Sequence, residues 1–276
     1  PIIIEKSRGL GGRISTRRIK NRNFYFDHGA QYVSAKGKNF DEYLMKAMLE
    51  GNAAEWFIQP PNNQEKSKRK IVGLNGMTNL VRPLAANLNL HFNSPVKKIH
   101  PHNYGWKIET TNQIYETIFD IVITTIPAPQ VIPLVSENSV LTSELNKVKF
   151  TSCLAAMIAF EDKISLNENI YSNPASEIIW CARNSSKPSQ TLNKDCWILH
   201  ASSHWSAKNI EDEKHHIAKN LLEIFRKKLN LRLPKVHFLA GHKWRFAFAS
   251  LPLNKKFLVS DNKSLIMGGD WCLGNR

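Results

Sequence analysis

The chain has 276 residues, of which 42% are hydrophobic and 22% are charged, and its formal net charge at pH 7 is +15. These proportions are typical of globular proteins and exclude wholesale disorder. No apolar run reaches the roughly 18 residues of a membrane-spanning helix, so we expect no membrane partner. The charge indicates either a solvated lysine-rich surface or a field that attracts an anionic ligand. Because no zinc-finger, RNP or basic-zipper pattern accompanies it, a nucleic-acid partner is not expected.

The first segment carries the most informative pattern. The run Ile2–Ile4 predicts a strand, Glu5 stands at its end, and a glycine-rich loop leads to Arg13. In dinucleotide-binding folds, an acidic residue at the end of a buried strand binds the ribose hydroxyls. Gly11 and Gly12 would let the backbone approach a phosphate, which Arg13 would neutralise. The phosphate-binding G-x-G-x-x-G should lie about 20 residues before the acid, so we expect a sequence that is truncated at this end.

An aromatic strand, two helices and a polar loop are predicted next. Residues 24–32 predict a strand that breaks at Gly29, and residues 41–50 predict a short helix. Residues 59–70 are typical of a polar loop. After Gly76, apolar residues at three- and four-residue spacings predict a further helix. These apolar residues are Met77, Leu80, Val81, Leu84 and Leu88.

Short strands are predicted in the middle of the chain, at 90–92, 96–99 and 106–108. The run Ile121–Ile126 is apolar on both faces, as in a central strand of a parallel sheet. Pro127 and Pro129 end it.

The second half predicts another sheet, with strands at 154–160, 178–180, 197–200 and 236–240. Residues 211–229 predict an amphipathic helix. A last strand, Leu265–Met267, runs into Gly268, Gly269 and Asp270. Such a motif normally opens a helix, so we expect truncation at this end too.

The cysteines are scattered, without a C-x-x-C pair or a histidine at metal-ligand spacing. This favours reduced thiols in a cytoplasmic protein, and it predicts no metal site. The cysteines are Cys153, Cys181, Cys196 and Cys272.

Seven blocks of the sequence resemble the renalase-like branch of the flavin-containing amine oxidase superfamily, in the order of that family. The blocks are 5–18, 26–32, 126–130, 182–188, 200–202, 242–245 and 269–274. The resemblance implies an α/β fold (α+β overall), with a Rossmann-like FAD-binding domain interleaved with an antiparallel-sheet substrate domain. The FAD-binding domain would comprise 1–32, 71–130 and 262–276, lacking the first strand and helix. The substrate domain would comprise 33–70 and 131–261.

The resemblance also implies residues that hold a noncovalent FAD. Glu5 would bind the adenosine ribose, Gly12 and Arg13 the pyrophosphate and ribityl region, and Gly29–Gln31 would pass the isoalloxazine ring. The plain alternatives are an exposed strand-end acid, a salt-bridged surface arginine and a turn glycine. The full set is Glu5, Gly11, Gly12, Arg13, Gly29, Ala30, Gln31, Val96, Thr125, Pro127, Gly269 and Asp270.

Candidates for the substrate pocket come mostly from the second sheet. Arg245 could bind a phosphate or carboxylate in a forked geometry. For His200, Trp180 and Trp244, packing in the core is the alternative. The catalytic candidates are Gln31, Asn184, His200, Trp244 and Arg245.

The function that the resemblance implies is an FAD-dependent oxidoreductase. It would transfer a hydride from a small amine or a dihydronicotinamide-type substrate to FAD, with dioxygen as acceptor. A nicotinamide dinucleotide isomer is a credible substrate. Two alternatives stay open: a cofactor-free remnant that acts as a binding or structural domain, and a basic protein that associates with nucleic acid.

Overall fold

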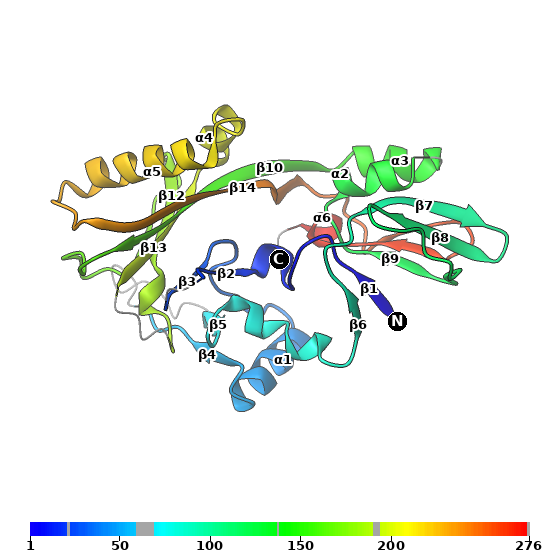
Figure 1. The fold of residues 1–276 in the computed structure, drawn as a ribbon, viewed down its shortest axis with the longest axis horizontal. Helices are drawn as coiled ribbons and strands as arrows, with labels where there is room; N and C mark the ends of the chain where they lie inside the picture. The colour runs from blue at the N-terminus through cyan, green and yellow to red at the C-terminus, as the bar shows by residue number, and fades with distance from the viewer. Residues whose placement is uncertain (21–22, 59–68, 137, 190–193, 275–276) are drawn as a thin grey trace. The chain divides into compact units, whose positions relative to one another are not determined.

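This computed structural model describes residues 1–20, 23–58, 69–136, 138–189 and 194–274 (Figure 1). Contacts within the chain divide it into two compact units, which we describe separately. Unit 1 consists of Pro1–Gly9, Asn87–Thr151 and Phe246–Arg276, and unit 2 of Leu10–Ala86 and Ser152–Arg245. Within the described ranges, no helix is long and apolar enough to cross a membrane.

This division follows contacts, whereas the predicted FAD-binding and substrate domains were defined by function. The two differ, because the contacts place residues 10–32 and 71–86 in unit 2 together with most of the second sheet. The functional domain boundaries therefore stay a prediction.

Unit 1 begins with the predicted first strand. β1 (Ile2–Ile4) pairs in parallel with β6 (Asn89–His91), with Ile3 opposite Leu90. β7 (Val96–His102) and β8 (Gly105–Thr110) form an antiparallel hairpin. These elements confirm the predicted strands at 2–4, 90–92, 96–99 and 106–108.

A second small sheet in unit 1 has the strand order β15–β16–β9. β9 (Val122–Thr124) pairs in parallel with β16 (Leu265–Met267), and β15 (Leu258–Val259) is antiparallel to β16. The parallel pairing of β9 is confirmed.

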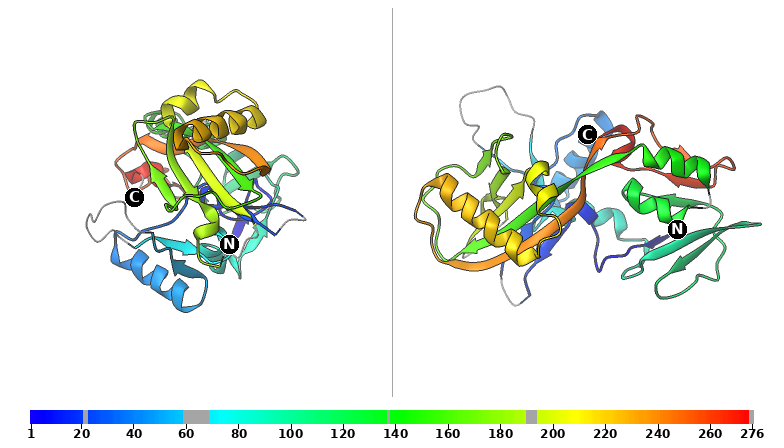
Figure 2. Two further views of the ribbon diagram at one scale, coloured as in Figure 1. Left: turned by 90° about the vertical axis from the view of Figure 1, so that its left-hand side faces the viewer. Right: turned by 90° about the horizontal axis from the view of Figure 1, so that it is seen from above.

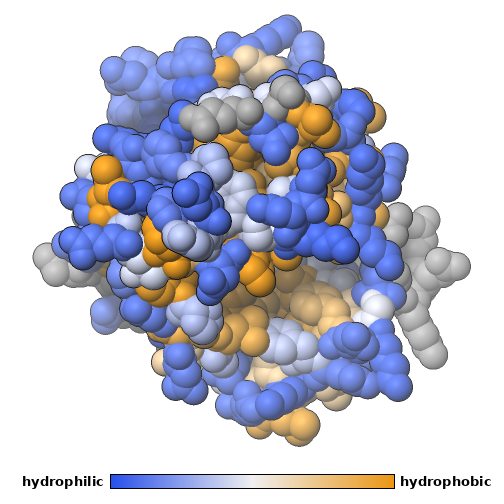
Figure 3. Space-filling model, turned by 90° about the vertical axis from the view of Figure 1, so that its right-hand side faces the viewer, coloured by the Kyte–Doolittle hydropathy of each residue, from blue (hydrophilic) through white to orange (hydrophobic). Residues whose placement is uncertain are grey.

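The predicted central position of β9 is wrong, because β9 is an edge strand among the described residues. Side chains alternate between the two faces of a strand. Thr124 is accordingly buried, while Ile121 and Ile123 are 58% and 65% exposed. Figure 3, which views the molecule from the end that carries β7–β9 in Figure 1, shows patches of hydrophobic surface among hydrophilic side chains.

Helices cover the inner face of this sheet and complete the core of unit 1. Val131 and Leu145 are fully buried in that core, as is Trp271 near the C-terminus. The helical elements are α2 (Ala128–Val131), η4 (Ile132–Leu134), α3 (Ser139–Asn146) and α6 (Asp270–Leu273).

Unit 2 is built on the predicted second sheet, whose strand order is β11–β12–β13–β10–β14. Pairing is antiparallel from β11 through β10. The prediction of an antiparallel sheet in this part of the chain is therefore confirmed. The strands are β10 (Lys149–Phe160), β11 (Ile170–Ser172), β12 (Ile178–Arg183), β13 (Asp195–Ala201) and β14 (Val236–Leu251).

Two helices pack on one face of that sheet, as Figures 1 and 2 show for α5. These are α4 (Ser203–Lys208) and α5 (Lys214–Leu229). The predicted amphipathic helix is confirmed, since Ile217, Leu221 and Phe225 of α5 are buried against the sheet. The helix begins at residue 214 and not 211, because Glu213 adopts an extended N-cap conformation.

The opposite face of the sheet is covered by the N-terminal part of unit 2. Phe26 of β3 is fully buried against Met157 and Ile198 of the sheet. The covering elements are η1 (Gly12–Ile14), β2 (Thr16–Arg18), β3 (Tyr25–Asp27), α1 (Lys38–Leu49), β4 (Ala53–Glu55) and β5 (Ile71–Gly73). The aromatic strand predicted at 24–32 forms only over Tyr25–Asp27, and the helix predicted at 41–50 forms with an earlier start, at Lys38. The predicted polar loop lies almost entirely in residues 59–68, outside the described ranges.

The helix predicted after Gly76 is wrong. Two short 3₁₀ turns, η2 (Met77–Leu80) and η3 (Pro83–Ala85), stand in its place. Pro83 lacks the N–H that a continuous helix needs and its ring crowds the preceding turn. Leu84, which the spacing placed on the buried face, is 60% exposed.

Candidate functional site

The predicted site residues fall into two groups, one in each unit. Unit 1 carries Glu5, Val96, Thr125, Pro127, Gly269 and Asp270, and unit 2 carries all the others. All five catalytic candidates lie in unit 2.

Glu5 directly follows β1, as predicted. Its backbone N–H donates to the carbonyl of His91 (2.9 Å), which continues the pairing with β6. Its half-buried carboxylate accepts a hydrogen bond from the backbone N–H of Ser7 through Oε1 (2.7 Å). The acid thus lies at the carboxyl end of a parallel strand, where open α/β sheets bind ligands. Its ribose contact stays a prediction.

The ends of β9 and β16 form a second part of this group. The N–H of Gly268 donates to the carbonyl of Thr124 (2.9 Å). The buried hydroxyl of Thr124 has no hydrogen-bond partner among the described residues. A Cβ on Gly268 would meet nothing within 4 Å, whereas one on Gly269 would lie 2.8 Å from Trp271 Nε1. The open position is therefore Gly268, which sequence reasoning did not select.

The other predicted site residues of unit 1 lie in the core, at helix starts or directly after a strand. Val96 packs against the core of unit 1 and pairs with Thr110. Pro127 is the N-cap of α2, and Asp270 is the first residue of α6. Thr125 is exposed directly after β9. Nothing in these contacts tests the predicted contacts with FAD.

In unit 2, the predicted phosphate loop is a tight turn. Gly11 has φ +112° and Gly12 has φ +50°, values in the left-handed region that glycine tolerates best. A Cβ on Gly12 would meet nothing within 4 Å. The turn brings the carbonyl of Arg13 to the N–H of Ala30 (2.9 Å), so this loop lies beside the predicted flavin segment.

Packing inside unit 2 leaves no room for a side chain at Gly29. A Cβ at this position would lie 2.1 Å from the Arg13 carbonyl oxygen and 3.1 Å from the Trp244 ring. The small residue that the resemblance places beside a flavin is thus already required by the packing of unit 2.

The carbonyl of His28 joins two of the catalytic candidates. It accepts hydrogen bonds from His200 Nε2 (3.1 Å) and from Trp244 Nε1 (2.9 Å). Because a carbonyl only accepts, Nε2 of His200 carries a proton. The indole of Trp244 also packs against the rings of His28 and His242, at centroid distances of 5.0 and 4.3 Å.

The imidazoles of this cluster are neutral at pH 7. Burial lowers the pKa of His28 to about 3, with further lowering from His242 and Arg17. Burial likewise lowers the pKa of His200 to about 4 and that of His242 to about 4. His200, neutral and protonated on Nε2, is held as a hydrogen-bond donor.

Gln31 presents a buried acceptor. Its amide nitrogen donates to the carbonyls of Asp27 and Gly29. Since both neighbours only accept, the orientation of the amide is fixed. Oε1 is then left buried with no partner among the described residues, as is Nε1 of Trp180. Trp180 lies next to His200, its cross-strand partner.

Two catalytic candidates are placed apart from this group. The Asn184 amide donates to the carbonyl of Tyr25 (2.9 Å) and accepts from the N–H of Asp27 (3.3 Å), so it binds the β3 backbone. Arg245 follows Trp244 on β14 and points to the opposite face. There it forms a forked ion pair with Glu211 (2.8 and 3.0 Å).

Sequence reasoning missed a buried ion pair beside the flavin segment. Lys187 Nζ lies 2.9 Å from Asp27 Oδ2, and both side chains are 1% exposed. Both residues stand inside blocks that carry the resemblance, 26–32 and 182–188. Their position inside these blocks was the signal that the sequence offered.

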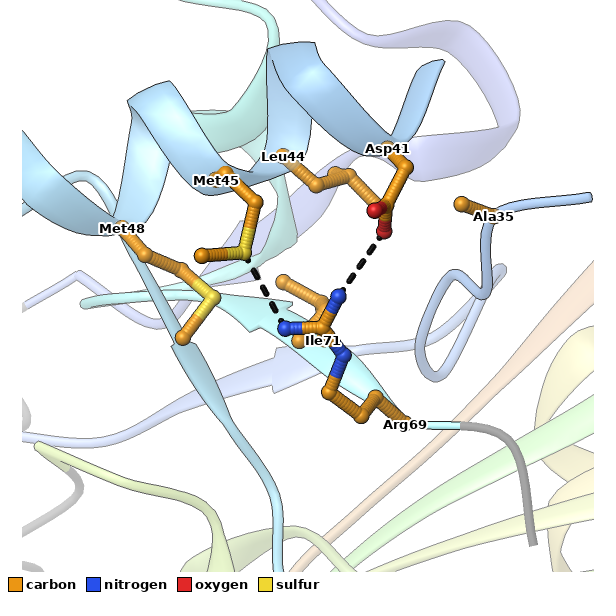
Figure 4. A pocket seen from close by; sticks show the side chains of 7 residues that line it. All are labelled: Ala35, Asp41, Leu44, Met45, Met48, Arg69 and Ile71. Carbon is orange, nitrogen blue, oxygen red and sulfur yellow. Dashed lines mark hydrogen bonds and ion pairs between the residues drawn. The ribbon is translucent and has the colours of Figure 1, made fainter. Parts of the chain in front are cut away.

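A separate hollow of about 200 Å³ lies under α1 (Figure 4). Arg69 crosses it and binds Asp41 (2.9 Å) and the sulfur of Met45 (3.0 Å). The other lining residues are Ala35, Leu44, Met48 and Ile71, none of them a predicted site residue. Among the described residues, no cluster of His, Cys, Asp and Glu could hold a metal ion.

One family model matches this chain, and several solved structures share its fold. The model of a family described as flavin-containing amine oxidoreductase matches residues 50–249. A protein described as a candidate protoporphyrinogen oxidase from Exiguobacterium sp. 255-15 superposes with a TM-score of 0.56 at 15% identity, covering 77% of this chain and 49% of its own. An oxidoreductase from Methanosarcina mazei gives 0.54 at 15%, covering 74% and 51%. A protein from Pyrococcus furiosus gives 0.63 at 12%, covering 98% and 85%. The chain thus spans about half the length of the first two structures.

Proposed function

The chain belongs to the flavin-containing amine oxidoreductase family, and we propose that it is an FAD-dependent oxidoreductase of the renalase-like type. The single observation that carries the flavin-dependent activity is the family match over residues 50–249, which includes four of the five catalytic candidates. The renalase-like type is supported by the resemblance of the sequence blocks. The substrate would be a small amine or a dihydronicotinamide-type compound, and dioxygen would accept the electrons.

The residues present fit a flavin dinucleotide. The orphaned acceptor Oε1 of Gln31 needs an N–H donor, and an isoalloxazine ring has one. Open space at Gly12 would admit a phosphate close to the backbone. In unit 1, the orphaned hydroxyl of Thr124 and the open Gly268 suit a polar ligand at the strand ends.

Each group of residues would have a distinct task. Glu5 would accept hydrogen bonds from the adenosine ribose, and Gly12 with Arg13 would hold the pyrophosphate. When bound, FAD would supply the hydride acceptor. Gln31 would orient the ring or the substrate through Oε1, while His200 and Trp244 would hold the segment that carries Gln31 by binding the His28 carbonyl.

The lowered pKa values make these imidazoles weak bases, which favours a mechanism without a protein base at this position. Because His200 uses its Nε2 proton to bind the carbonyl of His28, it is a donor that orients the backbone. A substrate whose own nitrogen lone pair drives hydride loss requires no acid–base pair. Amines and dihydronicotinamides both have such a lone pair.

Flavin binding is the first test of this proposal. We would titrate FAD with the purified chain and follow quenching of flavin fluorescence and the visible absorption bands. Saturable binding of one FAD per chain supports the proposal. A protein that stays colourless and leaves the fluorescence unchanged contradicts it and favours the cofactor-free remnant.

The substrate class needs a second experiment. The FAD-loaded protein would be mixed anaerobically with 2- or 6-dihydronicotinamide dinucleotides and, separately, with simple amines. Bleaching of the flavin by one class identifies it, and peroxide formed on admission of air identifies dioxygen as acceptor. No bleaching with either class would remove both substrate proposals.

A further inference from the structure

The geometry points to Lys187 and Asp27 as positioning residues that hold the segment His28–Gln31 in its place. This inference rests on the proposed function, which puts the same segment beside the flavin. It adds two residues that neither the sequence motifs nor the family match assigns to the site.

Asp27 is the point where four parts of unit 2 meet. Its Oδ1 accepts hydrogen bonds from the hydroxyl of Thr16 (2.7 Å) and from the backbone N–H of Met77 (2.9 Å). Its Oδ2 binds Lys187 Nζ (2.9 Å). The residue is fully buried, so the carboxylate depends on these partners in place of water.

The ammonium group of Lys187 is held by a second contact besides Asp27. Its ammonium lies 5.2 Å from the centroid of the Trp56 ring, within the range of a cation–π contact. Trp56 Nε1 in turn donates to the hydroxyl of Ser186 (3.2 Å). A long flexible side chain is thereby held in one geometry at the end of β3.

The segment His28–Gln31 starts directly after this anchored carboxylate. Downstream it is held by weaker bonds: the His28 carbonyl accepts from His200 and Trp244, and the Ala30 N–H donates to Arg13. Charge-assisted hydrogen bonds are stronger than neutral ones. The ion pair therefore fixes the position of the first residue of the segment, and the neutral hydrogen bonds fix the backbone that follows.

The direct test neutralises the pair without leaving one charge buried. A lone Lys187→Met change would strand the Asp27 carboxylate and could prevent folding. The double variant Asp27→Asn/Lys187→Met removes both charges, and the amide oxygen still accepts from Met77. The control is Glu161→Gln/Lys194→Met, which neutralises a half-buried ion pair of unit 2 at the end of β10.

Two readouts in the flavin-free protein report position. They are the indole ¹H–¹⁵N resonance of Trp244 and the hydrogen-exchange rate of the Ala30 amide. We expect the double variant to melt cooperatively, with a shifted Trp244 resonance and Ala30 exchange about tenfold faster. The control variant should leave both unchanged. A folded double variant with wild-type values for both readouts overturns the inference.

Two further measurements keep the test decisive. If the double variant does not fold, Lys187→Arg retains the charge with a differently shaped head group, and it should shift the Trp244 resonance by a smaller amount; no shift overturns the inference. FAD affinity should fall about tenfold in the double variant and stay constant in the control. If the wild-type chain binds no FAD, the proposed function fails, while the Trp244 and Ala30 readouts still decide the positioning.

Discussion

At the scale of single residues, most polar side chains of the candidate site already form hydrogen bonds within the protein. His200, Trp244 and Asn184 form hydrogen bonds with backbone groups of residues 25–28. Gln31 alone among the catalytic candidates retains a buried acceptor without a partner in the described chain. We therefore expect direct ligand contact from Gln31, and backbone positioning from the other three.

Replacing Gln31 with methionine tests this difference. The change keeps the length of the side chain but removes the whole amide, both Oε1 and the Nε2 that binds the Asp27 and Gly29 carbonyls. FAD affinity should fall at least about five- to tenfold, since the loss of Oε1 alone costs one hydrogen bond of about 1 kcal/mol. Fluorescence titration measures it. Gln113→Met, at an exposed loop position, is the control. Equal affinity of wild type and Gln31→Met would rule out the contact.

Gly29→Ala should destabilise unit 2 even without a ligand. The new Cβ would sit 2.1 Å from the Arg13 carbonyl oxygen, and relieving such overpacking costs about 1–3 kcal/mol. Urea unfolding monitored by tryptophan fluorescence gives the free-energy change. Gly9→Ala, where the Cβ meets nothing within 4 Å, should unfold like wild type. A stable Gly29→Ala protein would mean that the turn can move aside.

At the scale of elements, local sequence patterns predicted most strands and helices but not which strands pair with one another. The β-branched run of β1 and the stripe of α5 are local signals, and both elements form where they were expected. The helix after Gly76 failed because one proline outweighed five well-spaced apolar residues. Strand β9 formed as predicted, yet its position at the sheet edge depends on which strands pair, and sequence spacing does not contain that information.

The site shows the same division. Alternation along a strand separates Trp244 from Arg245, but the strand predicted at 236–240 stops short of both residues, whereas β14 extends to Leu251. The pairing of Asp27 with Lys187 joins residues 160 positions apart, and no local pattern encodes it. The packing reason for Gly29 likewise needs the Arg13 carbonyl and the Trp244 ring in space.

The edge strand β9 has a testable consequence. Unpaired edges with exposed apolar side chains promote association between chains, and Ile123 is 65% exposed there. Ile123→Lys should reduce concentration-dependent light scattering and change the unfolding free energy by less than about 0.5 kcal/mol. Ile114→Lys, at a 55% exposed position in the turn after β8, should scatter like wild type. Equal effects of the two variants would mean that net charge, and not the edge, governs association.

At the scale of the whole molecule, the buried histidines couple stability to pH. The pKa of His28 is about 3, and those of His200 and His242 are about 4, against 6.5 for an unperturbed imidazole. Between pH 6.5 and 4 the unfolded chain therefore binds more protons than the folded one. The free energy of unfolding rises with pH in that window, so acidification below pH 6.5 destabilises the protein.

Urea unfolding at pH 7.5, 6 and 5 measures this dependence. Each buried imidazole contributes at most about 1.4 kcal/mol per pH unit. Lysine partners hold the pKa of Glu144 and of Glu161 near 2, below an ordinary 4.5, so stability from these carboxylates is lost only below pH 4.5. His242→Asn should flatten the slope between pH 6 and 5, because one proton-binding difference disappears, whereas His215→Asn, at an exposed position of α5, should not. A wild-type protein equally stable at pH 7.5 and pH 5 would mean that the imidazoles are protonated in the folded state.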